Sequence, residues 1–266
     1  MHRRQLILGS AALLAAGSSA FAAPAADPKV LRIGVTAGIA AEVLEQALPF
    51  AEKLGLKIKI IEFQDYIRPN AALADGDLEA NIFQTIPFFE DQTKAHNWKF
   101  TIVAKAFTLP MAFYSKKVKS FAEAPVGAKV GIPNDQAMGG RALLILAANG
   151  IIKLRDGVGL LPGPYDVIEN PKKLKFVELE AAQLPRSLDD LTISAVNGNY
   201  AYLAGLNPSR DGILVESADG PYVCPIVTRT EDKDRPWVQK LIEAYHNPAV
   251  RDFINQKYKG SVIAAF

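Results

Sequence analysis

Residues 178–206 have the sequence ELEAAQLPRSLDDLTISAVNGNYAYLAGL, in which a short apolar run is followed directly by a polar Asn-Gly-Asn-Tyr cluster. The run LTISAV, at residues 191–196, has the composition of a buried β-strand. Asn197 is the first amide beyond that run. The stretch therefore predicts a strand that delivers amide side chains to a cleft.

Toward the N-terminus, the sequence alternates between strand-like and helix-like segments. Residues 31–37, LRIGVTA, and residues 57–63, KIKIIEF, are strand-like. Between them, apolar residues recur at spacings of three and four, and Gly55 follows as a helix terminator. A strand, a helix and a second strand in this order predict a parallel crossover. The alternation continues to residue 198, so the fold class that we expect is α/β.

The C-terminal part of the chain follows a different pattern. Residues 223–230, VCPIVTRT, are strand-like, and residues 236–260 have the composition of one or two closing helices. Asn247-Pro248 lies between them and favours a helix stop, because proline restricts the residue before it.

The first 22 residues are typical of a signal peptide. Arg3 and Arg4 precede an apolar run, and Ala20-Phe21-Ala22 has the small-x-small pattern of a cleavage site. Ordinary secretion and the twin-arginine route both remain open, and both deliver the chain to the periplasm. The apolar run is too short to span a bilayer, and no later segment approaches the roughly 20 apolar residues that a spanning helix needs.

The charge and cysteine content narrow the choice of partners. Removal of residues 1–22 leaves 28 basic and 28 acidic residues, without a basic run or stripe that would indicate nucleic acid or anionic lipid as a partner. The single cysteine, Cys224, lies far from the cleavage site, so neither a disulfide nor an acyl anchor at the mature N-terminus is expected. We predict a freely diffusing periplasmic monomer of 244 residues.

Two further blocks carry a family resemblance together with the opening stretch: EFQDYIRPNAALADGDLEANIFQ at residues 62–84 and GIPNDQAMGGRALLIL at residues 131–146. With them the chain resembles, from about Leu31 to Gly260, the methionine-type substrate-binding proteins of bacterial ABC importers, the NlpA lipoprotein family. The resemblance implies a two-lobed periplasmic binding protein fold, with residues 30–109 plus 222–266 as lobe I and 110–221 as lobe II. A hinge of two crossover segments would run near Leu109-Pro110 and Gly220-Pro221.

The resemblance also implies a function. The chain would be the periplasmic substrate-binding component of an ABC importer that binds methionine, or a related small amino-acid-like carboxylate, between its lobes. Its partners would be a permease with its cytoplasmic ATPase, and no cofactor or metal is implied. Family members are usually tethered through a lipidated cysteine at the signal-cleavage site, which this sequence does not have.

Arg141 is the candidate for the ligand's carboxylate. It follows Gly139-Gly140 shortly after a predicted strand, which predicts a place in the first turn of a helix. A cation is disfavoured there by the helix dipole, and a bound anion would relieve the conflict. The guanidinium would contribute two parallel hydrogen bonds. An exposed arginine paired with Asp135 explains the spacing equally well, and the resemblance favours the binding role.

The remaining pocket residues are implied by the resemblance. Tyr66, Phe83 and Phe88 match aromatic positions that line the family's methionine pocket, where aromatic rings suit a thioether sulfur. Taken singly, each is also a common core residue. Asn197 matches the family's polar contact to the ligand. The alternative is a turn asparagine in left-handed conformation, which the glycine after it favours.

Four positions depart from the family pattern. Thr85 stands for histidine, Met138 for asparagine, Phe88 for tyrosine and Cys224 for asparagine. All four changes remove a polar group, and cysteine is a poor substitute for an amide oxygen. An alternative is therefore that the pocket has been retuned to a carboxylate or sulfur compound other than methionine.

Two other classes of protein were weighed. An enzyme is not expected, because His96 and His246 lack metal-ligand spacing and an isolated Cys224 is more often a small buried hydrophobe than a nucleophile. A ligand-sensing module for a membrane receptor stays open, because sensing and import use the same difference between open and closed lobes.

Overall fold

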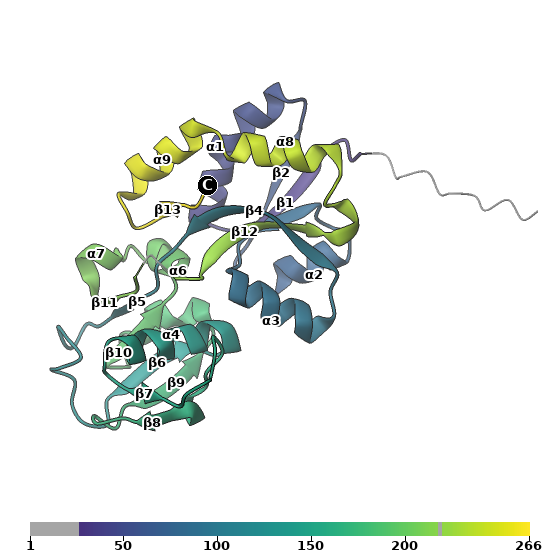
Figure 1. Cartoon of the computed structure of the whole chain (residues 1–266). Helices are drawn as coiled ribbons and strands as arrows, with labels where there is room; N and C mark the ends of the chain where they lie inside the picture. The colour runs from purple at the N-terminus through teal and green to yellow at the C-terminus, as the bar shows by residue number, and fades with distance from the viewer. Residues whose placement is uncertain (1–26, 218–219) are drawn as a thin grey trace, which may run out of the picture.

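The computed structural model describes residues 27–217 and 220–266. The predicted signal peptide and its cleavage site near Ala22 lie outside the described residues. In the described part of the chain, the strands form two large mixed sheets and one small hairpin-like pair, and the sheets lie in two lobes (Figure 1). No helix among these residues is long and apolar enough to cross a membrane.

The first lobe is built on a six-stranded sheet. Strands β1, β2 and β3 are parallel, with Ile33 level with Ile60 of β2 and Ala80 of β3. Strand β12 runs antiparallel to both β3 and β4, and it therefore joins the C-terminal part of the chain to the N-terminal part. In spatial order the strands are β13 (Ile263–Ala264), β4 (Phe100–Thr108), β12 (Val223–Arg229), β3 (Ala80–Ile82), β1 (Leu31–Thr36) and β2 (Ile58–Phe63).

Helices cover both faces of this sheet (Figure 1). On one face lie α1 (Ile39–Lys53), α8 (Pro236–Tyr245) and α9 (Pro248–Tyr258), which pack into one apolar core with β1 and β3. On the other lie α2 (Arg68–Ala74) and α3 (Ile86–His96). There Leu73 and Leu78 pack with Phe100 and Val227 in a smaller core.

The second lobe is built on a five-stranded sheet whose strands are β11 (Gly212–Val215), β5 (Ala112–Tyr114), β10 (Ile193–Val196), β6 (Lys129–Pro133) and β9 (Lys175–Leu179). Strands β10, β6 and β9 are parallel, and β5 is antiparallel to both of its neighbours. The helices are α4 (Gln136–Ala148), α5 (Leu184–Ser187), α6 (Gly198–Leu203) and α7 (Pro208–Asp211), with 3₁₀ turns at Pro164–Asp166 and Ala181–Gln183. Strands β7 (Lys153–Leu154) and β8 (Val167–Glu169) form the separate pair. A third 3₁₀ turn, Thr230–Asp232, follows β12 in the first lobe.

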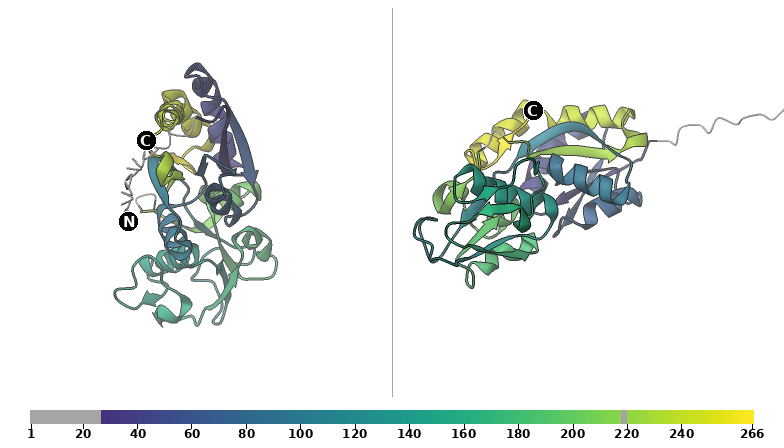
Figure 2. Two further views of the ribbon diagram at one scale, coloured as in Figure 1. Left: turned by 90° about the vertical axis from the view of Figure 1, so that its right-hand side faces the viewer. Right: turned by 60° about the horizontal axis from the view of Figure 1, so that its bottom comes forward.

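Two segments connect the lobes, as the three views agree (Figures 1 and 2). The chain leaves β4 through Leu109-Pro110 to reach β5, and it returns from β11 to β12. The two segments are held to each other, because the backbone N–H of Glu216 donates to the carbonyl of Met111 at 3.0 Å. This is the two-lobed periplasmic binding protein fold with a hinge of two crossovers. The lobe boundaries at 109/110 and 221/222 stay a prediction.

A polar contact joins the lobes away from the hinge. The hydroxyl of Tyr202, on α6, donates to the carboxylate of Glu42, on α1, at 3.0 and 3.1 Å. The same carboxylate accepts from Tyr258 at 2.5 Å and pairs with Lys257 at 2.8 Å, both on α9. Glu42 therefore receives one donor from the second lobe and two from the first.

The sequence-based predictions of regular structure are largely confirmed, including the helix break at Asn247-Pro248. Helix α3 was not predicted, because its mixed residues give a weak apolar periodicity. The antiparallel strands β5 and β11 were missed as well, since each is only three or four residues long.

Candidate functional site

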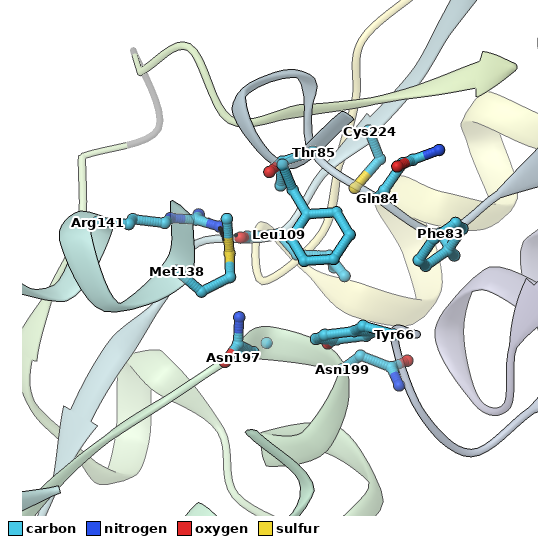
Figure 3. A pocket seen from close by; sticks show the side chains of 12 residues that line it. Tyr66, Phe83, Gln84, Thr85, Leu109, Met138, Arg141, Asn197, Asn199 and Cys224 are labelled. Carbon is cyan, nitrogen blue, oxygen red and sulfur yellow. Dashed lines mark hydrogen bonds between the residues drawn. The ribbon is translucent and has the colours of Figure 1, made fainter. Parts of the chain in front are cut away.

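A narrow cavity of about 30 Å³ lies between the two sheets. This volume has room for little more than a water molecule, so a larger ligand needs the lobes to move apart. Figure 3 shows the side chains around this cavity, which come from both lobes. Its lining consists of Tyr66, Phe83, Gln84, Thr85, Phe88, Leu109, Met138, Arg141, Asn197, Gly198, Asn199 and Cys224.

All eight residues predicted from the sequence line this one cavity. The first lobe contributes five of them: Tyr66 from the loop after β2, Phe83 and Thr85 from the segment after β3, Phe88 from α3 and Cys224 from β12. The second lobe contributes Met138 and Arg141 from α4 and Asn197 from the end of β10. Their role in ligand binding stays a prediction.

Three aromatic rings form the apolar wall. The centroids of Tyr66, Phe83 and Phe88 lie 6.2–6.4 Å from one another, with Phe88 edge-on to both of the other rings. Tyr200 of α6 extends the wall, because its ring centroid lies 4.9 Å from that of Tyr66. Such edge-to-face contacts fix the orientation of the rings. The wall therefore presents ring faces and edges to any apolar group in the cavity.

The surroundings of Arg141 differ from both sequence-based interpretations. It is the sixth residue of α4, in the second turn, because the helix begins at Gln136 and not at the glycine pair. The Nε–Nη2 edge of its guanidinium is already occupied, since both nitrogens donate to the carboxylate of Glu216. Pairing with Asp135 is wrong too: Arg141 is 2% exposed, and Asp135 accepts from the Met138 N–H at 2.8 Å. The missed partner, Glu216, lies 75 residues away, a separation that gives no local signal.

The glycine pair of α4 has a packing role. A side-chain carbon on Gly139 would lie 2.6 Å from the carbonyl oxygen of Pro133, at the end of β6. Glycine at this position therefore lets the helix approach the strand closely. The two glycines set the position of α4, and with it the positions of Arg141 and Met138.

Asn197 does not adopt the left-handed conformation that the turn interpretation required. Its φ is −61° and its ψ is 140°, and it caps the N-terminus of α6 without a side-chain capping bond. Gly198 follows where a side-chain carbon would lie 3.0 Å from Cβ of Leu109. The start of α6 thus packs directly on the first crossover. The Asn197 amide stays at the floor of the cavity, below Met138 (Figure 3).

Three buried oxygens around the cavity have no hydrogen-bond partner within the described residues: Thr85 Oγ1, Asn197 Oδ1 and Asn199 Oδ1. Thr85 caps α3 by position, but its hydroxyl makes no capping bond. Buried polar atoms are normally paired, and leaving one unpaired costs about 1–3 kcal/mol. Because an asparagine amide can turn to present either nitrogen or oxygen, these groups can serve an ammonium or a carboxylate.

Four lining residues were not among the predicted site residues: Gln84, Leu109, Gly198 and Asn199. The amide of Gln84 belongs to a buried network in which its Nε2 donates to Asn70 Oδ1 at 2.8 Å and to Asn81 Oδ1 at 3.1 Å. The network fixes the backbone on either side of Gln84, which carries Phe83 and Thr85. Its signal is visible in the sequence, because Asn70, Asn81 and Gln84 are amides inside otherwise apolar segments.

The surroundings of Cys224 and of the two histidines, His96 and His246, do not suit a catalytic or metal-binding role. Burial raises the pKa of the Cys224 thiol to about 12, so the thiol stays protonated at neutral pH. The His246 ring stacks on Phe266 and its Nε2 lies 2.8 Å from the Lys105 carbonyl, while His96 stacks on Trp98. Across residues 27–217 and 220–266, no group of three His, Cys, Asp or Glu side chains is arranged to hold a metal.

The profile of the family described as NlpA lipoprotein matches residues 31–266 of this chain. The chain belongs to the NlpA family. The chain is also similar to the D-methionine-binding lipoprotein MetQ of Salmonella typhimurium, with 45% identity over 260 residues that cover 97% of this chain and 94% of that protein. The MetQ protein of Escherichia coli is 44% identical over 260 residues, which again cover 97% of this chain and 94% of that protein.

Solved structures agree with the family membership. A nutrient binding protein from Burkholderia cenocepacia, bound to methionine, superposes with a TM-score of 0.87 at 45% identity and covers 89% of this chain and 100% of its own. The methionine binding protein MetQ gives the same TM-score and identity, with coverage of 90% and 99%. At 45% identity, both structures are similar to this chain in sequence as well as in fold.

A second cavity adjoins the first and is bordered by Asp135, Asp65 and Glu180, with Tyr66 and Phe88 shared between the two cavities. Asp135 lies between the lobes at the N-terminus of α4. Burial raises the pKa of its carboxyl from 3.8 to about 6, against the lowering effect of the backbone donors of the helix. The folded NlpA-family chain therefore binds a proton at Asp135 more tightly than the unfolded chain.

We expect Asp135→Asn to remove a pH-dependent loss of stability. Because the folded pKa lies above the unfolded value, the contribution of Asp135 to the free energy of unfolding falls as pH rises from about 4 to about 6, by roughly 2 kcal/mol. Asparagine is an equally good helix cap. The difference in melting temperature, variant minus unsubstituted protein, should therefore rise across this range. Parallel curves of melting temperature against pH would contradict the assignment.

Proposed function

We propose that this chain is the periplasmic substrate-binding component of an ABC importer and that its ligand is free methionine, bound between the lobes. The proposal is supported by the methionine-bound relative from Burkholderia cenocepacia and by the names of the MetQ relatives. A permease with a cytoplasmic ATPase is the corresponding partner. The chain acts as a monomer, exported with cleavage near Ala22.

The observation that carries the proposal is the chemical composition of the cavity. One cation, Arg141, stands at one end, and Tyr66 and Phe83 stand at the other (Figure 3). Phe88 and several amide side chains complete the lining. A free amino acid needs a donor for its carboxylate, acceptors for its ammonium and an apolar surface for its side chain. Aromatic rings make favourable contacts with a thioether sulfur in particular.

The unpartnered oxygens offer acceptors to a ligand that has an ammonium group. Thr85, Asn197 and Asn199 supply acceptors in the same cavity as Cys224, where the resemblance implies an asparagine in the family. An ammonium group has three N–H donors, which these oxygens can take up. The same cavity thus contains acceptors that can take the place of the amide lost at Cys224.

Closure of the lobes accompanies binding in this proposal. Most residues that line the cavity are almost completely buried, including Arg141 at 2% and Asn197 at 5% exposed. A ligand can reach them only when the lobes separate, and the two crossovers allow that movement. The contact between Tyr202 and Glu42 would then stabilise the closed state.

The relatives with MetQ names are lipoproteins, and this chain departs from them in its cysteine. Its single cysteine, Cys224, is buried in β12, so the sequence offers none for lipidation near Ala22. We infer a protein that diffuses freely in the periplasm. We assign it no catalytic activity, since the protonated thiol of Cys224 is a poor nucleophile.

Titration calorimetry with L-methionine and D-methionine tests the proposed function. The protein should first be unfolded and refolded to remove any co-purified ligand. We expect saturable binding with a 1:1 stoichiometry, and a loss of at least 100-fold in affinity for Arg141→Ala, because the buried carboxylate of the ligand would lose its charged donor. Arg210→Ala is the matched control, since Arg210 is an exposed arginine of the same lobe, paired with Asp211. No heat from a folded sample would contradict the proposal.

A pair of tyrosine variants tests the role of closure. Tyr202→Phe removes the hydroxyl that joins the lobes, whereas Tyr258→Phe removes a hydroxyl that binds the same carboxylate within one lobe. We expect the first to weaken methionine binding about fivefold, the equivalent of about 1 kcal/mol, and the second to leave affinity nearly unchanged. Equal effects of the two substitutions would show that the bond across the lobes has no special part in closure.

A further inference from the structure

Most hydrogen-bond donors of Arg141 are already used within the protein. Its Nε donates to Glu216 Oε1 at 2.9 Å, and its Nη2 donates to Glu216 Oε2 and to the carbonyl of Leu109, the latter at 2.8 Å. Of the five N–H donors of a guanidinium, three are thereby committed. The partner of Nη1 is the sulfur of Met138, at 3.8 Å, which is a weak acceptor. Nη1 is thus the part of Arg141 that is free to meet a ligand.

Glu216 is held in place as firmly as Arg141. Its carboxylate accepts from the backbone N–H of Met111 at 3.0 Å, and its own backbone N–H donates back to Met111. The ring of Tyr222 lies against the guanidinium, 4.2 Å from ring centroid to the central carbon. The side chains of Arg141 and Glu216 are 3% and 9% exposed. This is a buried, multiply bonded pair and not a mobile surface ion pair.

The ion pair of Arg141 and Glu216 disfavours a ligand that has a net charge. Arg141 and Glu216 together have no net charge, and Arg141 is the sole charged residue among those that line the cavity within the described residues. A ligand with a net charge would bring that charge into the closed cavity without compensation, which is costly in a medium of low dielectric constant. A zwitterion brings two charges that compensate each other.

We propose that Glu216 determines the specificity of the site. By occupying the Nε–Nη2 edge of Arg141 and cancelling its charge, it limits the site to ligands that offer a carboxylate to Nη1 and have no net charge, the class of zwitterionic amino acids. The inference rests on the proposed function and names a residue outside the cavity lining as the cause of its selectivity. It also predicts that carboxylates lacking an amino group are rejected.

Glu216→Gln tests the inference, because glutamine keeps an oxygen for the Met111 N–H and removes the negative charge. The probes are L-methionine and 4-(methylthio)butanoate, which differs from methionine by a hydrogen in place of the ammonium group. Calorimetry on the refolded protein gives the ratio of the two dissociation constants. We expect the preference for methionine to fall at least tenfold in the variant, because the site then has a net positive charge that favours the anion.

The control is Glu169→Gln, which removes a charge paired with Lys153 on the surface of the same lobe and should leave the ratio unchanged. If Glu216→Gln weakens both probes by the same factor, Glu216 has only a structural role and the inference is overturned, while methionine binding stands. Failure of the unsubstituted protein to bind methionine would instead overturn the proposed function and the inference with it.

A second measurement does not depend on the folding of the variant. The unsubstituted protein should bind both 4-(methylthio)butanoate, an anion, and L-methioninol, a cation, at least tenfold more weakly than methionine. Binding of either charged analogue as tightly as methionine would overturn the inference.

Discussion

The buried ion pair between Arg141 and Glu216 is the constraint on which the rest of the site depends. Arg141 projects from α4 in the second lobe, and its guanidinium binds Glu216 on the returning crossover and the carbonyl of Leu109 on the first. One side chain thus touches both segments that join the lobes. Because removing one partner of a buried pair leaves an uncompensated charge, the pair fixes the local geometry strongly. The hinge and the anchor that we propose for the ligand are therefore parts of one structure.

The lobes divide the other requirements of the proposed amino-acid site between them. The first lobe supplies the aromatic wall and Thr85, and the second supplies the cation and the amides of Asn197 and Asn199. Both lobes line the cavity, so in the proposed function the contacts to a ligand and the contacts between the lobes form together. In that proposal, the bond from Tyr202 to Glu42 adds to closure at a distance from the cavity. Binding energy in such an arrangement is shared between the ligand and the interface that closes over it.

The sequence predicted the fold and the residues that line the cavity well. Strand-like segments predicted β1 and β2, the Asn247-Pro248 step separated α8 from α9, and the resemblance to the family supplied all eight predicted lining residues. What those residues contact was predicted less well. The start of α4 was misplaced because the glycine pair was taken as a boundary, although Gly139 is inside the helix and permits its close approach to Pro133. The partner of Arg141 was missed because Glu216 reaches it only through the tertiary fold, 75 residues along the chain.

The most direct test of this account is a crystal structure of the protein with L-methionine bound. The account predicts methionine in the cavity bordered by Tyr66 and Phe88, with its carboxylate within hydrogen-bond distance of Nη1 of Arg141 and with the bond from Nε to Glu216 still in place. A carboxylate that displaces Glu216 from the guanidinium, or a ligand bound elsewhere in the molecule, would contradict it.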